Sequence, residues 1–157
     1  MFQDITTILQ DEKAFKYCVD KLADFCKKQD ATTVVAIESR GFIFGAAIAY
    51  KLGIKFAPVR KPGKLPWKTV SEEYALEYGT DKIEIHVDAV KKGEKIFVID
   101  DLLATGGTAD VAAKLVEKLG GIVVGIGFVI ELTGTLHGRE KLKKYNLLTL
   151  VQVEVHE

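Results

Sequence analysis

Two patterns of apolar residues alternate along the chain. Short runs that are apolar almost throughout predict buried strands, and they cover Thr32–Ile37, Ile54–Val59, Lys95–Asp100 and Gly121–Leu132. Segments with apolar residues at helical spacing separate these runs and predict helices over Asp11–Gln29, Gly41–Gly53 and Gly107–Leu119. Strands that are apolar on both faces and alternate with helices are typical of a parallel sheet covered on both sides. We therefore expect an α/β fold with a mostly parallel sheet flanked by helices.

Residues 60–90 break this alternation. The segment begins polar, basic and proline-containing, and then YALEY (74–78) and IEIHV (83–87) alternate apolar and polar residues around GTD (79–81). Such alternation predicts an antiparallel hairpin inserted between two units of the parallel sheet. Long insertions in compact domains are usually functional loops or lids. We expect residues 1–157 to form a single domain, in which residues 60–90 supply a flap and a basic loop.

Composition and charge narrow the class of function. Hydrophobic residues make up 48% of the chain and charged residues 28%, as in ordinary globular proteins. The 22 Lys and Arg balance the 22 Asp and Glu, so charge gives no global reason to bind nucleic acid or an anionic membrane. Any anion must then be bound by a local site. We find no secretory signal or membrane-spanning run, and expect a cytoplasmic protein with Cys18 and Cys26 as buried free thiols.

Chemistry-bearing residues follow the strand at Lys95–Asp100. Asp100 and Asp101 stand at its carboxyl end, where open parallel sheets bind ligands. The turn that follows offers backbone N–H groups, two threonine hydroxyls and a helix N-terminus, all suited to a phosphate; its residues are Ala104, Thr105, Gly106, Gly107 and Thr108. The turn lacks the lysine of a P-loop and the GxGxxG spacing of a dinucleotide site.

A phosphorylated ribose explains both halves of this segment. Carboxylates repel phosphate but accept hydrogen bonds from sugar hydroxyls, so Asp100 and Asp101 suit the 2′- and 3′-hydroxyls. The glycine turn suits the 5′-phosphate. The structural alternative is a capped helix after a buried strand, although paired acids are a costly choice for a strand end of that kind.

The segment VIDDLLATGGT (98–108) resembles the phosphoribosyl-diphosphate signature of the type I phosphoribosyltransferases. Three further stretches resemble the adenine phosphoribosyltransferases within that family: ESRGFIFGAAIA, PVRKPGKLP and LEYGTDKIEIHVDAV. The resemblance runs from about residue 2 to about residue 140. It implies the type I fold and a Mg²⁺-dependent transfer of phosphoribose from 5-phosphoribosyl-1-diphosphate to N9 of adenine, which gives AMP and diphosphate.

The resemblance also implies roles for particular residues. Those expected to bind diphosphate are Ser39, Arg40, Arg60, Lys61 and Lys64, with the basic loop acting partly across a homodimer interface. The expected catalytic residues are Glu77 on the flap, Asp100, Asp101 and Arg60. No residue is assigned as a metal ligand, because Mg²⁺ is expected to bind together with phosphoribosyl diphosphate. From composition alone, the basic loop also suits a solvated turn, and Glu77 and its neighbour Tyr78 suit ordinary strand exposure.

The purine site falls at the start of the chain. The resemblance implies that Phe2 stacks on adenine, that Leu102 lies on the other purine face, and that backbone groups near Gln3 contact the purine edge. Family members usually carry a further stretch before this point, whereas this sequence begins MFQD. Gln3 replaces the usual arginine, which a backbone contact tolerates.

Two alternatives to the adenine enzyme remain. A 6-oxopurine phosphoribosyltransferase commonly has a lysine after the last main strands, and GIGFVIELTG (125–134) has none. A regulator that binds phosphoribosyl diphosphate without turnover usually carries a DNA-binding segment. The sequence shows no helix-turn-helix extension or charge excess and keeps Glu77 and the basic loop, which favours the transferase.

Overall fold

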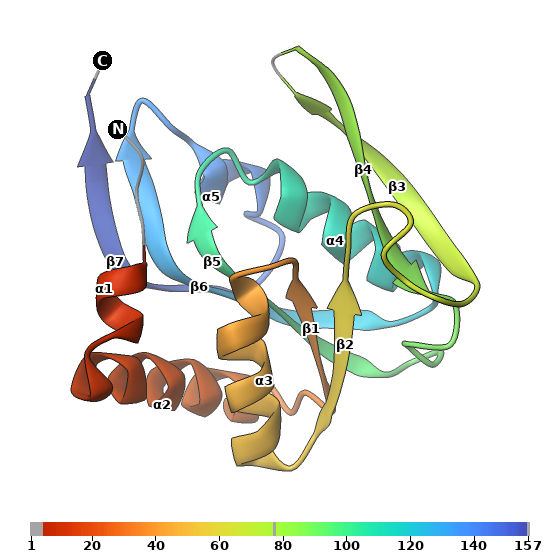
Figure 1. The fold of residues 1–157 in the computed structure, drawn as a ribbon, viewed down its shortest axis with the longest axis horizontal. Helices are drawn as coiled ribbons and strands as arrows, with labels where there is room; N and C mark the ends of the chain where they lie inside the picture. Colours follow the sequence, from red (N-terminus) through yellow and green to blue (C-terminus); the bar gives the residue numbers. More distant parts are fainter. Residues whose placement is uncertain (1–4, 77, 157) are drawn as a thin grey trace.

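The computed structural model describes residues 5–76 and 78–156. Five parallel strands form its central sheet, in the order β2-β1-β5-β6-β7. Their bounds are β1 Thr33–Ile37, β2 Lys55–Val59, β5 Lys95–Leu103, β6 Ile122–Gly134 and β7 Leu147–Val155. The expected parallel sheet is confirmed, and Figure 1 shows all five arrows running toward one edge.

Helices cover both faces of the sheet. One face packs against α1 Thr6–Leu9, α2 Glu12–Lys28 and α3 Gly41–Leu52. The other packs against α4 Gly107–Lys118, and beyond α4 lies the short helix α5 Gly138–Lys141. The three long helices occupy nearly the predicted ranges. Asp11 caps α2 by accepting hydrogen bonds from the Lys13 and Ala14 N–H groups, at 3.0 and 3.1 Å.

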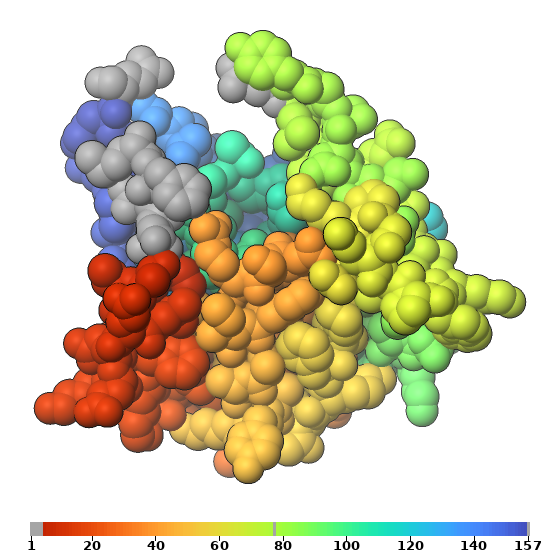
Figure 2. Space-filling view, in the orientation of Figure 1, coloured from red at the N-terminus to blue at the C-terminus, as the bar shows by residue number. Residues whose placement is uncertain are grey.

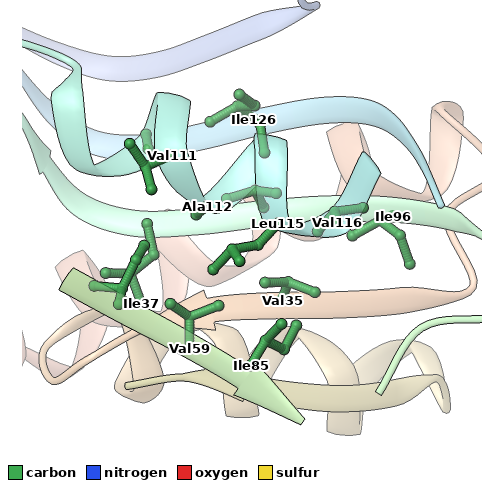
Figure 3. Close-up of a cluster of buried hydrophobic side chains, with 14 of the residues drawn as sticks. Val35, Ile37, Val59, Ile85, Ile96, Val111, Ala112, Leu115, Val116 and Ile126 are labelled. Atoms are coloured by element: carbon green, nitrogen blue, oxygen red, sulfur yellow. The ribbon is translucent and has the colours of Figure 1, made fainter. Parts of the chain in front are cut away.

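Successive side chains of the strands point alternately into two hydrophobic cores, one on each face of the sheet. In β1, Val35 and Ile37 point toward α4, whereas Val34 and Ala36 point toward α3. Figure 3 shows the first core, in which Leu115 and Val116 of α4 lie over the strand residues. A strand buried on both faces needs apolar residues at every position, which explains the unbroken apolar runs of the sequence.

The inserted segment forms the expected antiparallel hairpin of β3 Thr69–Leu76 and β4 Gly79–His86. The predicted turn at GTD is wrong in position, because Leu76 lies opposite Gly79 and Tyr74 opposite Asp81. The residues Gly79, Thr80 and Asp81 therefore belong to strand β4 and not to the turn. Ile83 and Ile85 of β4 point into the core beneath α4 and anchor the hairpin there.

Two further details differ from the sequence prediction. The strand predicted to end at Asp100 continues as β5 to Leu103, so both acids lie within its last residues. Strand β7 and helix α5 had no predicted counterpart.

The two cysteines are buried free thiols on α2, as predicted, and burial raises the pKa of Cys26 to about 12. Across the described residues, every helix is too short or too polar to cross a membrane.

Candidate active site

The carboxyl edge of the sheet gathers the predicted site residues from three connections. These connections follow β1, β2 and β5, and they bring Ser39, Lys61 and the turn at 104–108 to the same end of the molecule. Ligand sites of open parallel sheets occur at this edge. The surface there is hollowed between the hairpin and the teal residues around the turn before α4 (Figure 2).

Asp100 and Asp101 are held in fixed orientations. Asp101 is 4% exposed, and its Oδ2 lies 2.7 Å from the Arg40 guanidinium Nε. The Asp101 N–H donates to Asp100 Oδ1 at 2.8 Å. Burial and the neighbouring Asp101 charge raise the pKa of Asp100 well above its usual range, while the Arg40 charge opposes that shift.

Gly41 explains how α3 approaches these acids so closely. A Cβ on Gly41 would lie 3.0 Å from the Ile99 carbonyl oxygen and 3.1 Å from Asp100 Oδ1. Only glycine lets the start of α3 pack against β5 at this distance without a shift of the backbone. Gly41 belongs to the same SRG stretch as Ser39 and Arg40, but its packing role was not predicted from the sequence.

The glycine turn has the geometry of an anion site. Gly106 adopts φ +84°, which favours glycine, and α4 begins directly after it at Gly107. Gly106 has no side chain that could cap this end of α4, and among the described residues the Gly107 N–H makes only a long 3.5 Å contact with Thr105 Oγ1. The helix N-terminus adds partial positive charge, which favours a phosphate.

Two adjoining pockets share Asp100. The first is lined by residues of the turn from Ala104 to Thr108, together with Leu102 and Phe128. The second is lined by Glu38, Ser39, Arg40, Lys61 and both acids. The Glu38–Ser39 peptide bond is cis. Two anions, one in each pocket, would thus have Asp100 between them.

The basic loop is arranged unevenly. Lys61 lines the second pocket and donates to Asp81 Oδ2 on β4 at 2.9 Å, and Tyr74 donates to the same oxygen at 3.1 Å. Arg60 instead donates from Nε to Glu38 Oε1 at 2.7 Å and does not line the pocket. Lys64 is exposed outside it.

Some predicted residues fall outside the described part of the chain. These are Phe2, Gln3 and Glu77, while Leu102 is half-buried beside the turn. Sequence reasoning missed Glu38 and Asp81, the carboxylate partners of the two cations in the basic loop. Glu38 had a signal, because it directly precedes SRG at the end of a predicted strand. Asp81 had been assigned to the turn.

Comparison with known proteins decides among the enzyme classes that such a site can serve. The family model for the phosphoribosyl transferase domain matches residues 6–155. A curated adenine phosphoribosyltransferase of Brachyspira hyodysenteriae is 55% identical over 152 residues, which cover 97% of this chain and 89% of that protein. The chain belongs to the phosphoribosyltransferase family, among the adenine phosphoribosyltransferases.

Solved structures agree with this assignment. The crystal structure of adenine phosphoribosyltransferase from Thermoanaerobacter pseudethanolicus is similar with a TM-score of 0.92 and 54% identity, covering 97% of this chain and 88% of that one. The enzyme from Saccharomyces cerevisiae, solved with an imino-altritol bisphosphate and adenine, has a TM-score of 0.86 at 37% identity. The alignment covers 95% of this chain and 86% of the yeast chain. The predicted type I fold with a flap hairpin is therefore confirmed.

Proposed function

We propose that the protein transfers the phosphoribosyl group of 5-phosphoribosyl-1-diphosphate to N9 of adenine, giving AMP and diphosphate, at the carboxyl edge of its sheet. The family assignment supplies the reaction. The observation that carries the proposal is the wall that Asp100 contributes to both pockets, which places it between the glycine turn and a second pocket that contains Arg40, Lys61 and Asp101. Phosphoribosyl diphosphate has this order of groups: phosphate, ribose hydroxyls, diphosphate.

The ribose 5-phosphate half binds to β5 and the turn after it. Asp100 and Asp101 accept hydrogen bonds from the 2′- and 3′-hydroxyls, and Ala104, Thr105, Gly106, Gly107 and Thr108 hold the 5′-phosphate. The positive φ of Gly106 and the uncapped start of α4 support this role. The carboxylates also stabilise the positive charge that develops on the ribose while the bond from its anomeric carbon to diphosphate breaks and the bond to adenine N9 forms.

The diphosphate half binds in the second pocket. Ser39, Arg40 and Lys61 line it. Arg40 and Lys61 neutralise charge on the leaving group, the Ser39 hydroxyl donates a hydrogen bond to it, and Arg60 and Lys64 contribute from the basic loop. Mg²⁺ accompanies the diphosphate and supplies further charge neutralisation. The site fits such an ion, because the carboxylates of Glu38, Asp100 and Asp101 border the space proposed for the diphosphate, and Mg²⁺ usually takes ligands from one or two carboxylates and substrate phosphates.

Adenine binds beside the anomeric carbon. Phe2 stacks on one purine face, Leu102 covers the other, and backbone groups near Gln3 contact the purine edge. Glu77 assists the protonation change on the purine or steadies the closed flap. The half-buried position of Leu102 beside the ribose pocket supports the placement of the base on that side.

We also propose the setting in which the enzyme works. Residues 1–157 act as a single phosphoribosyltransferase domain in purine salvage, with residues 60–90 as flap and basic loop. Two free thiols support a reducing, cytoplasmic location. A homodimer is supported by apolar side chains exposed on α3, where Ile43 is 41% and Tyr50 91% exposed, and by Trp67 in the basic loop at 55%.

One experiment tests the reaction. The protein is incubated with phosphoribosyl diphosphate, Mg²⁺ and adenine, hypoxanthine or guanine in turn, and the nucleotide formed is identified by chromatography. We expect AMP from adenine. Formation of IMP or GMP in preference to AMP would favour the 6-oxopurine alternative, and binding of phosphoribosyl diphosphate without any nucleotide would favour the regulator.

A further inference from the structure

Glu131 is a buried carboxylate outside the proposed substrate contacts. It is 3% exposed on β6, directly beside Leu103 of β5 on one side and Gln152 of β7 on the other. A buried charge of this kind is costly unless it is paired and hydrogen-bonded. Its location, level with the end of β5, places it next to the strand that leads into the turn at 104–108.

Arg139 on α5 pairs with Glu131 in a two-pronged contact. Nε donates to Oε1 at 2.8 Å and Nη2 to Oε2 at 2.8 Å, and Nη2 also donates to the Thr149 hydroxyl at 3.1 Å. Thr149 in turn donates to Glu131 Oε2 at 3.2 Å. The fork geometry fixes the direction as well as the distance of Arg139, because a guanidinium and a carboxylate align as two planes. The start of α5 is thereby fixed relative to β6 and β7.

The residue before Arg139 touches the proposed phosphate turn. A Cβ on Gly138 would lie 2.5 Å from the Ala104 carbonyl oxygen and 2.7 Å from Leu103 Cδ1. A Cβ on Gly106 would lie 2.8 Å from the Gly138 carbonyl oxygen. The contacts of Gly138 with Ala104 and with Gly106 are therefore backbone on backbone, and the Leu103 side chain packs against the same glycine. A shift of α5 passes directly to the turn.

We propose that the Glu131–Arg139 pair positions the turn at 104–108 for the 5′-phosphate, through Gly138. This inference rests on the proposed binding of that phosphate by the turn. Both residues are positioning residues, since neither lines the two pockets. A displacement of about 1 Å in a positioning element can cost on the order of a hundred-fold in activity, so small changes at Arg139 are expected to reach the substrate.

The first test compares three single variants with the parent. Arg139→Lys keeps a positive charge beside Glu131 but loses the fork, and Arg139→Met loses both. We expect the dissociation constant of AMP, measured by calorimetry, to rise about ten-fold or more in Arg139→Met, with partial recovery in Arg139→Lys. The control is Glu94→Gln, which removes the ion pair of 3.0 Å between Glu94 and Lys55. Glu94 directly precedes β5, at the edge of the sheet opposite the proposed site, so this variant is expected to leave AMP affinity unchanged.

The second measurement separates positioning from general loss of structure. Diphosphate alone binds in the other pocket, so its affinity is expected to change less than two-fold in the variants that lose AMP. The KM for phosphoribosyl diphosphate is expected to rise, while the KM for adenine stays near that of the parent. Arg139→Lys leaves Glu131 paired with a cation, so this variant is expected to stay folded. Its AMP and diphosphate affinities can then be measured even if Arg139→Met unfolds.

Two outcomes overturn the inference. Either AMP and diphosphate affinity fall by the same factor, or AMP affinity is unchanged in a folded variant that lacks the fork. Failure of the underlying function is distinguishable, because it would show in the parent protein as a failure to bind AMP, or as unchanged AMP binding when the turn itself is altered at Gly106.

Discussion

The Nε of Arg40 lies 2.7 Å from Oδ2 of Asp101. One ion pair therefore joins the loop after β1 to the acidic end of β5. Asp101 is buried whereas the Arg40 side chain is 38% exposed, so the arginine keeps a face toward the pocket while it fixes the carboxylate. Geometry at the proposed diphosphate and ribose sites is thus coupled before any substrate arrives.

The first prediction concerns the paired acids. Asp100→Asn and Asp101→Asn each lose a charged acceptor for a ribose hydroxyl, which typically costs about 1.5–3 kcal/mol, or roughly ten- to a hundred-fold in affinity or rate. Steady-state kinetics should show this loss in kcat/KM for phosphoribosyl diphosphate. Circular dichroism checks that both variants are folded. Parent-like activity in both would remove the acids from the ribose site.

The second prediction concerns pH and the stability of the fold. The pKa of Asp100 is raised in the folded state, so the folded protein holds that proton more tightly than the unfolded chain. The stabilisation from this proton is complete below the ordinary pKa of the carboxyl and is lost as pH rises through the folded pKa. Asp100→Asn does not titrate there, so it should become more stable relative to the parent as pH rises.

Urea unfolding of both proteins between pH 4 and 8, with chelator present to exclude metal, measures this difference. Carboxylates elsewhere whose pKa is lowered by a cation, such as Glu131 beside Arg139, affect both proteins equally and cancel in the comparison. A stability difference that is constant with pH, or that shrinks as pH rises, would contradict the expected titration of Asp100.

The third prediction uses two glycines with nearly the same backbone angle. Gly106 has φ +84°, and a Cβ added to it would clash with the Gly138 carbonyl oxygen, whereas Gly93 has φ +81° and open space around the same position. Both Gly→Ala changes therefore carry the left-handed backbone penalty of about 1–2 kcal/mol. Only Gly106→Ala should also lose AMP affinity in a titration. Equal AMP affinity in the two variants would place the 5′-phosphate elsewhere.

Much of the fold was predictable because strands that are buried on both faces of the sheet appear in the sequence as uninterrupted apolar runs. Every position of β1 is buried, and the sequence there is uniformly apolar or β-branched. The candidate ribose site was predictable for a related reason. Asp100 and Asp101 interrupt an apolar strand, and Gly106 follows shortly after them in the sequence. Their closeness in the chain brings them together without knowledge of the tertiary structure.

The parts that escaped prediction depend on contacts between distant segments. Strand β7 lies at the sheet edge and carries exposed polar residues such as Gln152 and Glu154, so its apolar residues do not form an unbroken run. The Glu131–Arg139 pair joins β6 to the four-residue helix α5, which is too short to be stable without tertiary packing. The hairpin turn was misplaced because GTD has turn-forming residues, whereas the register is set by Ile83 and Ile85 in the core.

The fourth prediction concerns assembly. Light scattering should give about twice the monomer mass of 17.3 kDa, because Tyr50 and Ile43 expose apolar surface on one face of α3. Tyr50→Glu should shift the mass toward the monomer. Tyr78→Glu is the matched control, since Tyr78 is equally exposed at 89% but lies on the hairpin. A monomeric parent at assay concentration would contradict the dimer.

The last prediction separates the two lysines of the basic loop. Lys61→Met and Lys64→Met remove the same charge, but only Lys61 lines the pocket proposed for diphosphate. A charge-assisted contact is worth about 1.5–3 kcal/mol, so Lys61→Met should weaken diphosphate binding about ten- to a hundred-fold and Lys64→Met clearly less. Lys61 and Asp81 are exposed enough that their pair adds little stability, so both variants should melt alike. Equal losses of diphosphate affinity would mean that the loop acts through its total charge, and the pocket geometry would then not assign the anion to Lys61.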